Sequence, residues 1–503
     1  MTNSQKDVLL IGDTFVFNLQ TKKVQDNDTE QMESLTKQFL QKVGFENSFV
    51  KALREDFRQN TLADIVVNLL DTSTNPAVLH LSSALEREGF TYDVINCSLK
   101  HREQLIGFLK NIKYKAIGIS TTYTLEKMYI INLIDLIRKY SPEAKIILGG
   151  MFIVKLFKLQ KNEILQKELS LLNADYYIFN EVGERPFIDI LNYEQNSRPD
   201  IKNVSSIAFK NESGFEINSY EANNIDISIS NWSLSKNTTY AFLRTSKSCL
   251  FKCKFCDFPV IADTYKTKSI NIVLQEFENI KKADIKFVRF LDDTFNLPKK
   301  HFLDILNELA SKDYGFEWIS YIRCQYLDDE TVRLMKNSGC IGVFLGLESG
   351  NNEILKNMDK RATVEEYLQG ISFLHKYKIP TYGAFIVGFP GETDKTIEDT
   401  IRFMKQAKLQ YYRLFTWDYS DLAPIAREKE KYSLEVYEDG WKHATMSSSE
   451  AVEKCKMIMK EVDTSIHTTI SYDYTLYLNR NADTKDIFNE YLMRFNKMNT
   501  EQF

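Results

Sequence analysis

The sequence predicts an α/β protein made of two consecutive series of strands and helices and a mostly helical C-terminal segment. Short apolar runs alternate with amphipathic stretches from residue 7 to about 195, and again from Thr239 to about 417. This alternation is typical of parallel sheets that helices cover on both faces. Three closely spaced cysteines follow the first strand of the second series. They are therefore expected at the carboxyl edge of that sheet, where such folds bind ligands.

The composition is that of an ordinary soluble globular protein. The chain has 503 residues, 43% hydrophobic and 26% charged, and this length suits two or three domains. Its net charge of −5 gives no electrostatic reason to expect a nucleic acid or an anionic membrane as partner. No apolar run approaches the roughly 18 residues of a membrane span, and the N-terminus lacks a signal-peptide pattern. Because the few cysteines are expected to be free, we expect a cytoplasmic protein.

The first series contains five expected strands and the ligand edge that they form. The strands are 8–12, 91–96, 116–120, 145–150 and 174–179. Residues 76–88 should form a helix, because Asn75 suits the N-cap, Pro76 the first turn and Gly89 the stop. Ligands bind beyond the carboxyl ends of such strands. The candidate binding residues are those at the strand ends: Asp13, Thr14, Ser120, Thr121, Thr122, Gly149, Gly150, Asn180 and Glu181.

Two other segments accompany this first series. About 60 residues separate the first strand from its helix, including a charged helical stretch near 29–57. An insertion of this length at the ligand edge predicts a lid or cap, with a solvated helical decoration as the alternative. Residues 200–237 are expected to form a linker with a β-hairpin of 206–210 and 215–218. The expected domain boundaries are thus 1–199, 200–237, 238–417 and 418–503.

The second series has six expected strands, which lie near 239–245, 286–291, 316–322, 341–347, 381–388 and 411–416. The helices between them are expected near 269–283, 299–311, 328–338, 363–377 and 393–408. Six such units predict a partial (β/α)6 TIM barrel, short of the eight that close a full one.

The cysteine cluster is the strongest chemical signal in the chain. Cys249, Cys253 and Cys256 form a C-x3-C-x2-C pattern in a chain with only 7 cysteines. Three thiolates on one short loop favour a metal, and an iron–sulfur cube held by three thiolates keeps one iron open for a ligand. Zinc and inert buried thiols remain as alternatives, although no second cysteine pair follows and the nearest later histidine is His301. A disulfide framework is disfavoured because the cysteines are few and odd in number.

Residues 239–417 resemble the radical S-adenosylmethionine (SAM) superfamily in the cysteine spacing and in the aromatic Phe255 before the last cysteine. The resemblance implies a [4Fe–4S] cluster on Cys249, Cys253 and Cys256, with SAM chelating the open iron. It also implies that reduction cleaves SAM to a 5′-deoxyadenosyl radical. We expect a flavodoxin or a ferredoxin to supply the electron.

Further positions at the strand ends resemble the SAM-binding pattern of the family: Phe255, Asp292, Asp293, Arg323, Glu348 and Phe385. Glu348 matches the ribose-contacting position, and the stretch around Phe385 resembles the motif whose backbone pairs with adenine. Asp292 and Asp293 depart from the usual Gly-Gly-Glu. Each candidate has a structural alternative, such as a helix cap or a salt bridge at the barrel rim. Glu392, in the same stretch as Phe385, is expected to cap the next helix.

The first series resembles the Rossmann-like cobalamin-binding domain that precedes the barrel in cobalamin-dependent radical SAM enzymes. The likeness rests on 117–122, 146–150 and 175–184. The Asp-x-His-x-x-Gly motif that supplies a cobalt ligand in other cobalamin proteins is missing, and His80 is expected to be an ordinary histidine. A degenerate module that binds no cofactor is the alternative.

The C-terminal segment contains Trp441 and His443 in a string that looks like one in some cobalamin-dependent radical methylases of natural-product pathways. On an extended segment, the two side chains could offer an aromatic wall and a catalytic proton-transfer group. Core packing is an equally weighted alternative.

Together, the resemblances imply a methyltransferase that acts on a poorly activated centre of a peptide or natural-product intermediate. SAM would have two roles, and cobalamin would carry the methyl group. Non-methylating radical chemistry (epimerisation, cyclisation or cross-linking) is the alternative, and a sensor without turnover is a third possibility. We expect no nucleic-acid or membrane partner.

Overall fold

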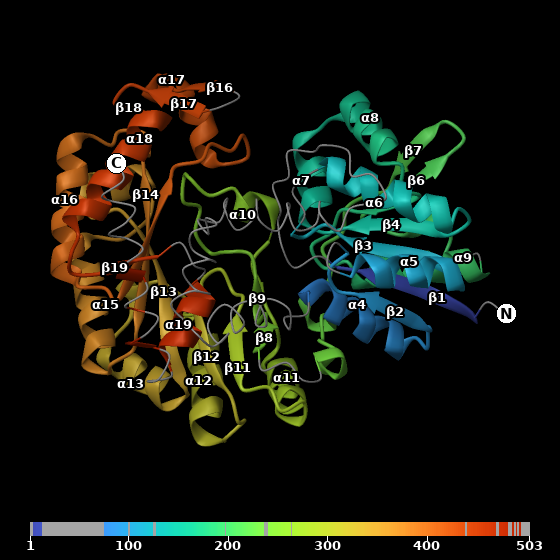
Figure 1. The fold of residues 1–503 in the computed structure, drawn as a ribbon, viewed down its shortest axis with the longest axis horizontal. Coiled ribbons are helices and arrows are strands. Elements are labelled where there is room, and N and C mark those ends of the chain that lie inside the picture. The colour runs from blue at the N-terminus through green and yellow to red at the C-terminus, as the bar shows by residue number, and fades with distance from the viewer. Residues whose placement is uncertain are drawn as a thin grey trace. The chain divides into compact units, whose positions relative to one another are not determined.

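The computed structural model describes residues 4–12, 75–98, 101–123, 127–196, 198–235, 240–262, 264–437, 440–468 and 472–480, with 485–486, 489 and 492–493. These residues divide into two compact units, one up to residue 235 and one from residue 240 (Figure 1). The candidate residues Asp13 and Thr14 and the expected insertion at 29–57 lie outside the described residues.

The first unit is built on a seven-stranded sheet of order β2-β1-β3-β4-β5-β6-β7. The five expected strands are present and parallel: β1 (Ser4–Ile11), β2 (Tyr92–Ile95), β3 (Ile112–Ser120), β4 (Lys145–Gly149) and β5 (Tyr176–Ile178). The hairpin of β6 (Ile207–Asn211) and β7 (Gly214–Ile217) pairs antiparallel with β5. The hairpin expected in this segment is therefore present, and it is part of the sheet of the first unit. Ile207, Ala208 and Phe209 are buried and extend the sheet.

Helices cover both faces of this sheet. α4 (Pro76–Arg87) and α9 (Glu184–Asn196) share one core, and α5 (Arg102–Asn111), α6 (Lys127–Tyr140), α7 (Met151–Leu159) and α8 (Asn162–Leu172) share the other. Right-handed crossovers require this arrangement, because the chain moves outward from β1 to β2 and then returns to β3. The helices that follow β1 and β3 therefore diverge, which makes the β1/β3 edge a ligand position.

The second unit is built on an all-parallel sheet of order β19-β15-β14-β13-β12-β11-β8 (Figure 1). The six expected strands are β8 (Tyr240–Leu243), β11 (Phe287–Phe290), β12 (Glu317–Ile322), β13 (Cys340–Glu348), β14 (Thr381–Val387) and β15 (Tyr411–Thr416). A seventh, β19 (Ile466–His467), pairs with β15. The sequence analysis missed it because two residues show no periodicity.

Side chains alternate between the two faces of this sheet. The outward face packs on helices: α11 (Ile270–Lys282), α12 (Lys299–Ser311), α13 (Asp329–Asn337), α15 (Val364–Lys376) and α16 (Asp394–Ala407). On this face Phe290 contacts Phe277 of α11. On the inward face Phe344 and Tyr382 stack with ring centroids 5.5 Å apart.

The C-terminal segment contains more β-structure than expected. β16 (Glu435–Tyr437), β17 (Gly440–His443) and β18 (Met446–Ser447) form a small antiparallel sheet, followed by α18 (Ser448–Glu461). The last described helix, α19 (Tyr472–Asn479), lies over β12 and β13 on the inward face (Figure 1). Leu476 of α19 fills the space above Gly342, where a Cβ atom would come within 2.8 Å.

None of the helices in the described parts of the chain is both long and apolar enough to cross a membrane.

The carboxyl ends of β3 and β4 meet without room for a side chain. Thr121 donates to the Gly149 carbonyl through its backbone N–H at 2.6 Å and through its hydroxyl at 2.8 Å. Gly150 has a φ of +105°, and a Cβ there would lie 2.6 Å from Thr122 N. This junction fixes the edge at which the first unit would hold a ligand.

Replacement of Gly150 by alanine should destabilise the first unit by about 1–3 kcal/mol, because the residue needs a backbone conformation that alanine rarely adopts. Gly107 is the matched control. It lies in α5, and a Cβ atom added there would have no neighbour within 4 Å, so Gly107→Ala should raise stability by roughly 0.5–1 kcal/mol. Thermal unfolding of both variants measures the two effects, and an unchanged Gly150→Ala transition would contradict the first.

Candidate active site

The three cysteines lie on a loop at the carboxyl end of β8. The short strands β9 (Ser246–Lys247) and β10 (Lys266–Thr267) pair antiparallel and close this loop at its base. Within it, the backbone N–H of Cys256 donates to the Cys253 carbonyl at 3.0 Å. Burial, followed by the neighbouring cysteines, raises the pKa of the Cys256 thiol to about 12. The Cys256 thiol therefore keeps its proton until a metal replaces it.

The donor set fits an iron–sulfur cube better than zinc. Within the described ranges, no group of three or more His, Cys, Asp or Glu side chains is arranged to hold a single metal ion. A zinc site needs four ligands at roughly 2.0–2.3 Å from one centre. In a cube each thiolate binds its own iron, so the sulfurs surround a larger body. Cys249, Cys253 and Cys256 offer three thiolates, one for each of three irons of such a cube.

Arg323 anchors this loop to the barrel. Its Nη2 donates to Cys253 Sγ at 3.0 Å and its Nη1 donates to the Lys360 carbonyl at 2.8 Å. The guanidinium also lies over the Phe251 ring, 3.5 Å from its centroid. Arg323 is 7% exposed. Two of its donors thus serve the cysteine loop and the barrel, and its expected role in holding a ligand carboxylate stays a prediction.

Asn296 fixes the backbone from which this arginine extends. Its Oδ1 accepts from Arg323 N at 3.0 Å, and its Nδ2 donates to the Arg323 carbonyl at 2.9 Å. Hydrogen bonds to cluster sulfurs tune the reduction potential of an iron–sulfur cube. Arg323 is thus placed to tune the cluster as well as to hold its loop.

Glu348 lies at the end of β13 and faces the interior. It has a φ of +66°, and its Oε1 accepts from Lys360 Nζ at 2.8 Å. Gly346 makes room for the carboxylate, since a Cβ there would lie 2.7 Å from Oε1. In the described part of the chain, Oε2 accepts no hydrogen bond, which leaves it for a ligand hydroxyl. This geometry suits the ribose-binding role that the sequence resemblance implied.

Lys360 is a site residue that the sequence analysis missed. It is 4% exposed, its amine pairs with Glu348, and it lies 5.6 Å from the centroid of the Phe255 ring. The residue follows α14 (Asn352–Asn357) in a short loop and carries no local motif. Only the tertiary fold brings it between the cysteine loop and β13.

Asp292 lies just beyond the carboxyl end of β11, as expected, and its carboxylate is held by neighbouring residues. Its carboxylate accepts from Thr245 N at 3.1 Å, from Thr245 Oγ1 at 2.9 Å and from Ser246 Oγ. It therefore fastens the strand end that leads into the cysteine loop, with two hydrogen bonds to Oδ1 and one to Oδ2. Its expected contact with SAM stays a prediction. Asp293 is partly exposed, and burial raises its pKa to about 7 against the opposing effect of Arg244. Asp293 remains a candidate for a ligand amine.

Phe385 also faces away from the interior. Its ring packs toward Phe403 of α16, with centroids 6.2 Å apart. The outward direction of this ring agrees with the parity of β14, and the expected contact of the backbone of this stretch with adenine stays a prediction.

His443 is buried, and both of its ring nitrogens are engaged. Nε2 donates to the Gly388 carbonyl at 3.0 Å, while Nδ1 accepts from Thr445 N at 3.3 Å and Thr445 Oγ1 at 3.2 Å. Trp441 stacks on the ring at 5.1 Å. Burial lowers the pKa of His443, so the ring is neutral. The geometry corrects the expected proton-transfer role to one of holding the Gly388 turn.

Glu392 holds the same turn from the other side. Its Oε2 accepts from Gly388 N at 2.5 Å, and burial raises its pKa to about 8. The helix cap expected of Glu392 is instead Thr393, whose side chain accepts from Thr396 N.

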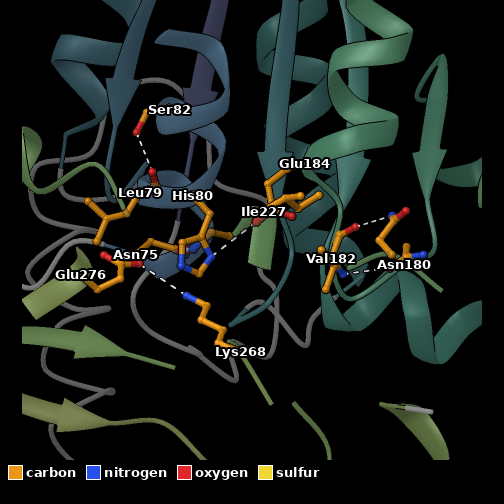
Figure 2. A network of polar contacts seen from close by, with 12 residues as sticks. Asn75, Leu79, His80, Ser82, Asn180, Val182, Glu184, Ile227, Lys268 and Glu276 are labelled. Carbon is orange, nitrogen blue, oxygen red and sulfur yellow. Dashed lines mark hydrogen bonds and ion pairs between the residues drawn. The ribbon is translucent and has the colours of Figure 1, made fainter. Parts of the chain in front are cut away.

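In the first unit, the strand ends form the edge that the sequence predicted. Ser120 Oγ donates to Thr122 Oγ1 at 3.3 Å beside the Gly149–Gly150 junction. Asn180 is committed to the fold, since its Nδ2 donates to the Glu221 carbonyl. Its Oδ1 accepts from Val182 N (Figure 2). The neighbouring Glu181 accepts from the Tyr220 hydroxyl at 3.5 Å.

His80 pairs with a carboxylate next to this edge. Its Nδ1 lies 3.7 Å from Glu184 Oε1, which joins α4 to the first residue of α9 (Figure 2). The side chains are 16% and 6% exposed. Hydroxyls, close-packed glycine backbone and the absence of the cobalt-ligand motif fit a cobalamin bound without a histidine from that motif.

Comparison with known proteins supports both units. Residues 243–404 match the radical SAM superfamily model and residues 63–184 match the B12 binding domain model. The chain is 27% identical over 230 residues to the uncharacterized methyltransferase PH0819 of Pyrococcus horikoshii, which covers 44% of this chain and 47% of the relative. It is 31% identical over 173 residues to the bacteriochlorophyllide d C-12(1)-methyltransferase of Chlorobaculum tepidum, covering 33% and 37%.

A solved structure shares the fold. The radical SAM methyltransferase TsrM from Kitasatospora setae, with tryptophan substrate and a SAM analogue bound, has a TM-score of 0.61 and 16% identity. The likeness covers 71% of this chain and 73% of that chain. The chain spans about half or less of the curated relatives that it matches.

The two family domains together cover more than half of the chain, in the order expected from the sequence. The protein belongs to the cobalamin-dependent radical SAM enzymes. The cofactors of this class are a [4Fe–4S] cluster, SAM and cobalamin, and the chain carries residues that fit each.

Replacement of Arg323 by methionine should remove the donor to Cys253 Sγ and loosen the cysteine loop. We expect the affinity of the protein for the cluster to fall about 10–100-fold, as it does when other residues that orient metal ligands are replaced. Iron and sulfide content measures this effect. Arg402→Met, at an exposed arginine of α16 paired with Asp399, is the control and should retain full iron.

Replacement of Glu392 by glutamine should flatten the pH dependence of stability. The folded protein keeps a proton on Glu392 between its ordinary pKa of 4.5 and about 8, whereas the unfolded chain releases it. The wild-type free energy of unfolding therefore falls as pH rises through this window. Glutamine still accepts from Gly388 N but does not ionise.

Chemical denaturation between pH 5 and 9, run roughly at unit steps, compares the two slopes. Glu398→Gln, at an exposed position on α16, the helix that follows Glu392, should match the wild type. A Glu392→Gln slope equal to that of the wild type would contradict the buried, protonated carboxyl.

Proposed function

We propose that the protein is a methyltransferase that acts on a poorly activated centre of a peptide or natural-product intermediate. One observation carries the proposal: a cysteine loop anchored by Arg323 and a cobalamin-type sheet edge occur in the same chain. The two curated relatives have methyltransferase in their names, and the solved structure is that of a methyltransferase. These names support the reaction type without specifying the substrate.

When bound, the cluster and SAM would supply a radical that takes hydrogen from the substrate, and cobalamin would supply the methyl carrier. The residues of the chain would hold and orient these groups. Cys249, Cys253 and Cys256 would bind the cluster, and Glu348 would accept from the SAM ribose. The turn at Gly388, fixed by two buried side chains, would keep the backbone of β14 in register for the adenine.

The inward face of the sheet would exclude water from the reaction. Tyr321, Phe344 and Tyr382 line it with aromatic surface close to one another. A radical quenched by solvent gives no product, so a dry interior protects the abstraction step. A flavodoxin or ferredoxin is the proposed electron donor.

Anaerobically reconstituted protein, incubated with SAM, reductant and hydroxocobalamin, tests the proposal. We expect 5′-deoxyadenosine from radical cleavage and, only when hydroxocobalamin is present, S-adenosylhomocysteine from methyl transfer. Cys253→Ala should lose at least about 100-fold of the 5′-deoxyadenosine rate, because the cube loses a ligand. Liquid chromatography with mass spectrometry quantifies both products.

Cys455→Ala is the matched control, since Cys455 lies in α18 away from the cysteine loop, and it should keep both activities. Formation of 5′-deoxyadenosine without any cobalamin-dependent S-adenosylhomocysteine would favour the non-methylating alternative. Absence of both products in protein with full iron content would overturn the assignment of an active radical enzyme.

A further inference from the structure

A charged pair lies inside the second unit, between the inward face of the sheet and α19. Arg289 of β11 donates through Nη1 to Asp473 Oδ2 at 2.9 Å. The Tyr240 hydroxyl donates to the same oxygen at 2.8 Å. Arg289 Nη2 also donates to the Tyr321 hydroxyl at 3.3 Å. The pair thus links three strands to the helix that closes the interior.

Aromatic rings surround this pair. The Arg289 guanidinium lies 4.6 Å from the Tyr472 ring centroid, 5.5 Å from that of Phe242 and 5.6 Å from that of Tyr321. Phe344 continues the wall, with its centroid 4.8 Å from that of Tyr472. A group that entered here would meet flat apolar surface on several sides and polar atoms at one point.

Three buried polar atoms of these side chains make no well-aligned hydrogen bond in the described part of the chain: Arg289 Nε, Asp473 Oδ1 and Tyr472 OH, the last of which lies against Arg289 and Tyr321. Asp473 is 2% exposed and Tyr472 is 3% exposed. Buried polar atoms are normally hydrogen-bonded, so three together call for a ligand that completes them. The other polar atoms of Arg289 and Asp473 are hydrogen-bonded, so Nε and Oδ1 are the atoms of these two side chains left for a ligand.

The arrangement defines the chemistry of that ligand. Arg289 Nε can only donate and Asp473 Oδ1 can only accept, so the ligand needs an acceptor and a donor on different atoms. The charges of Arg289 and Asp473 already offset each other. A carboxylate would meet Asp473 and an ammonium group would meet Arg289, so a neutral group fits best. An amide offers a carbonyl oxygen and an N–H group in this relation.

Arg289, Asp473 and Tyr472 lie below the residues proposed to hold the cofactors. Tyr321 precedes Arg323 by two residues on β12 and shares its inward parity, which separates them by about 7 Å along the strand. A substrate held at this floor would extend toward the carboxyl edge, where Glu348 and the cysteine loop lie. None of the comparisons assigns a role to this position.

We propose that Arg289, Asp473 and Tyr472 bind a neutral amide group of the substrate, whose aromatic or apolar body packs in the surrounding rings. This inference rests on the proposed function in one respect: it identifies the bound ligand as the substrate of the enzyme. The binding site itself rests on the three unpaired atoms and their aromatic enclosure. It narrows the substrate to amide-bearing molecules, such as a peptide or a carboxamide.

Three probes with the same ring and different charges test the site: benzamide, benzoate and benzylamine. Saturation-transfer NMR on the full-length, cluster-loaded protein should detect benzamide, with the two charged probes binding at least about tenfold more weakly. Tyr472→Phe removes only the hydroxyl and should weaken benzamide about tenfold, the upper range for one hydrogen bond. Tyr314→Phe, whose hydroxyl donates to Glu308 of α12 on the outward side, should leave binding unchanged.

Asp473→Asn provides an independent test that keeps the shape of the side chain. It leaves the Arg289 charge uncompensated, so preference should shift from benzamide to benzoate. The proposal would be overturned if the wild type bound the three probes equally, or if neither variant altered the binding of benzamide. Ordered water would then be the partner of the three unpaired atoms. The binding measurements need no turnover, so they remain valid if the protein transfers no methyl group. Conversely, if the probes do not bind as expected, 5′-deoxyadenosine formation still tests the proposed reaction.

Discussion

The candidate active site depends on the guanidinium of Arg323. This one group donates to a cysteine sulfur, donates to the backbone of the Lys360 loop and covers an aromatic ring of the cysteine loop. A loop with few regular hydrogen bonds of its own is thereby tied to β12 and β13. Because arginine has a planar fork with several donors, it can satisfy these demands at once, which a lysine with a single ammonium group could not.

Other buried ionisable side chains of the second unit also have specific partners. A buried ionisable side chain seldom acts alone: Glu348 has Lys360, Arg289 has Asp473, and Glu392 has the Gly388 turn that His443 holds from the other side. Buried charges and polar groups require such partners because water is not available to them. The positions where a partner is missing, in the aromatic floor, are therefore informative.

Much of the fold was predictable from local pattern, whereas the site was predictable only in part. The strands of both series and the cap at Asn75 followed from apolar runs and helix-start residues. The cysteine loop was found because its three ligands are close in sequence. Lys360 and the Arg289 cluster were not found, since only tertiary contacts bring their members together. The alternation of side chains along β14 would have been enough to predict that Phe385 points outward. The burial of His443 could not be predicted, because it depends on a turn 55 residues away in the sequence.

The late position of α19 has a consequence for biogenesis. The helix that forms the floor of the barrel begins at Tyr472, 216 residues after Cys256. At roughly 5–20 residues per second, a ribosome needs about 10–40 s to make that stretch. The cysteine loop is thus synthesised long before the interior is closed from below. Iron and sulfide delivered to a nascent chain would therefore reach the cysteine loop before α19 covers the inward face of the sheet.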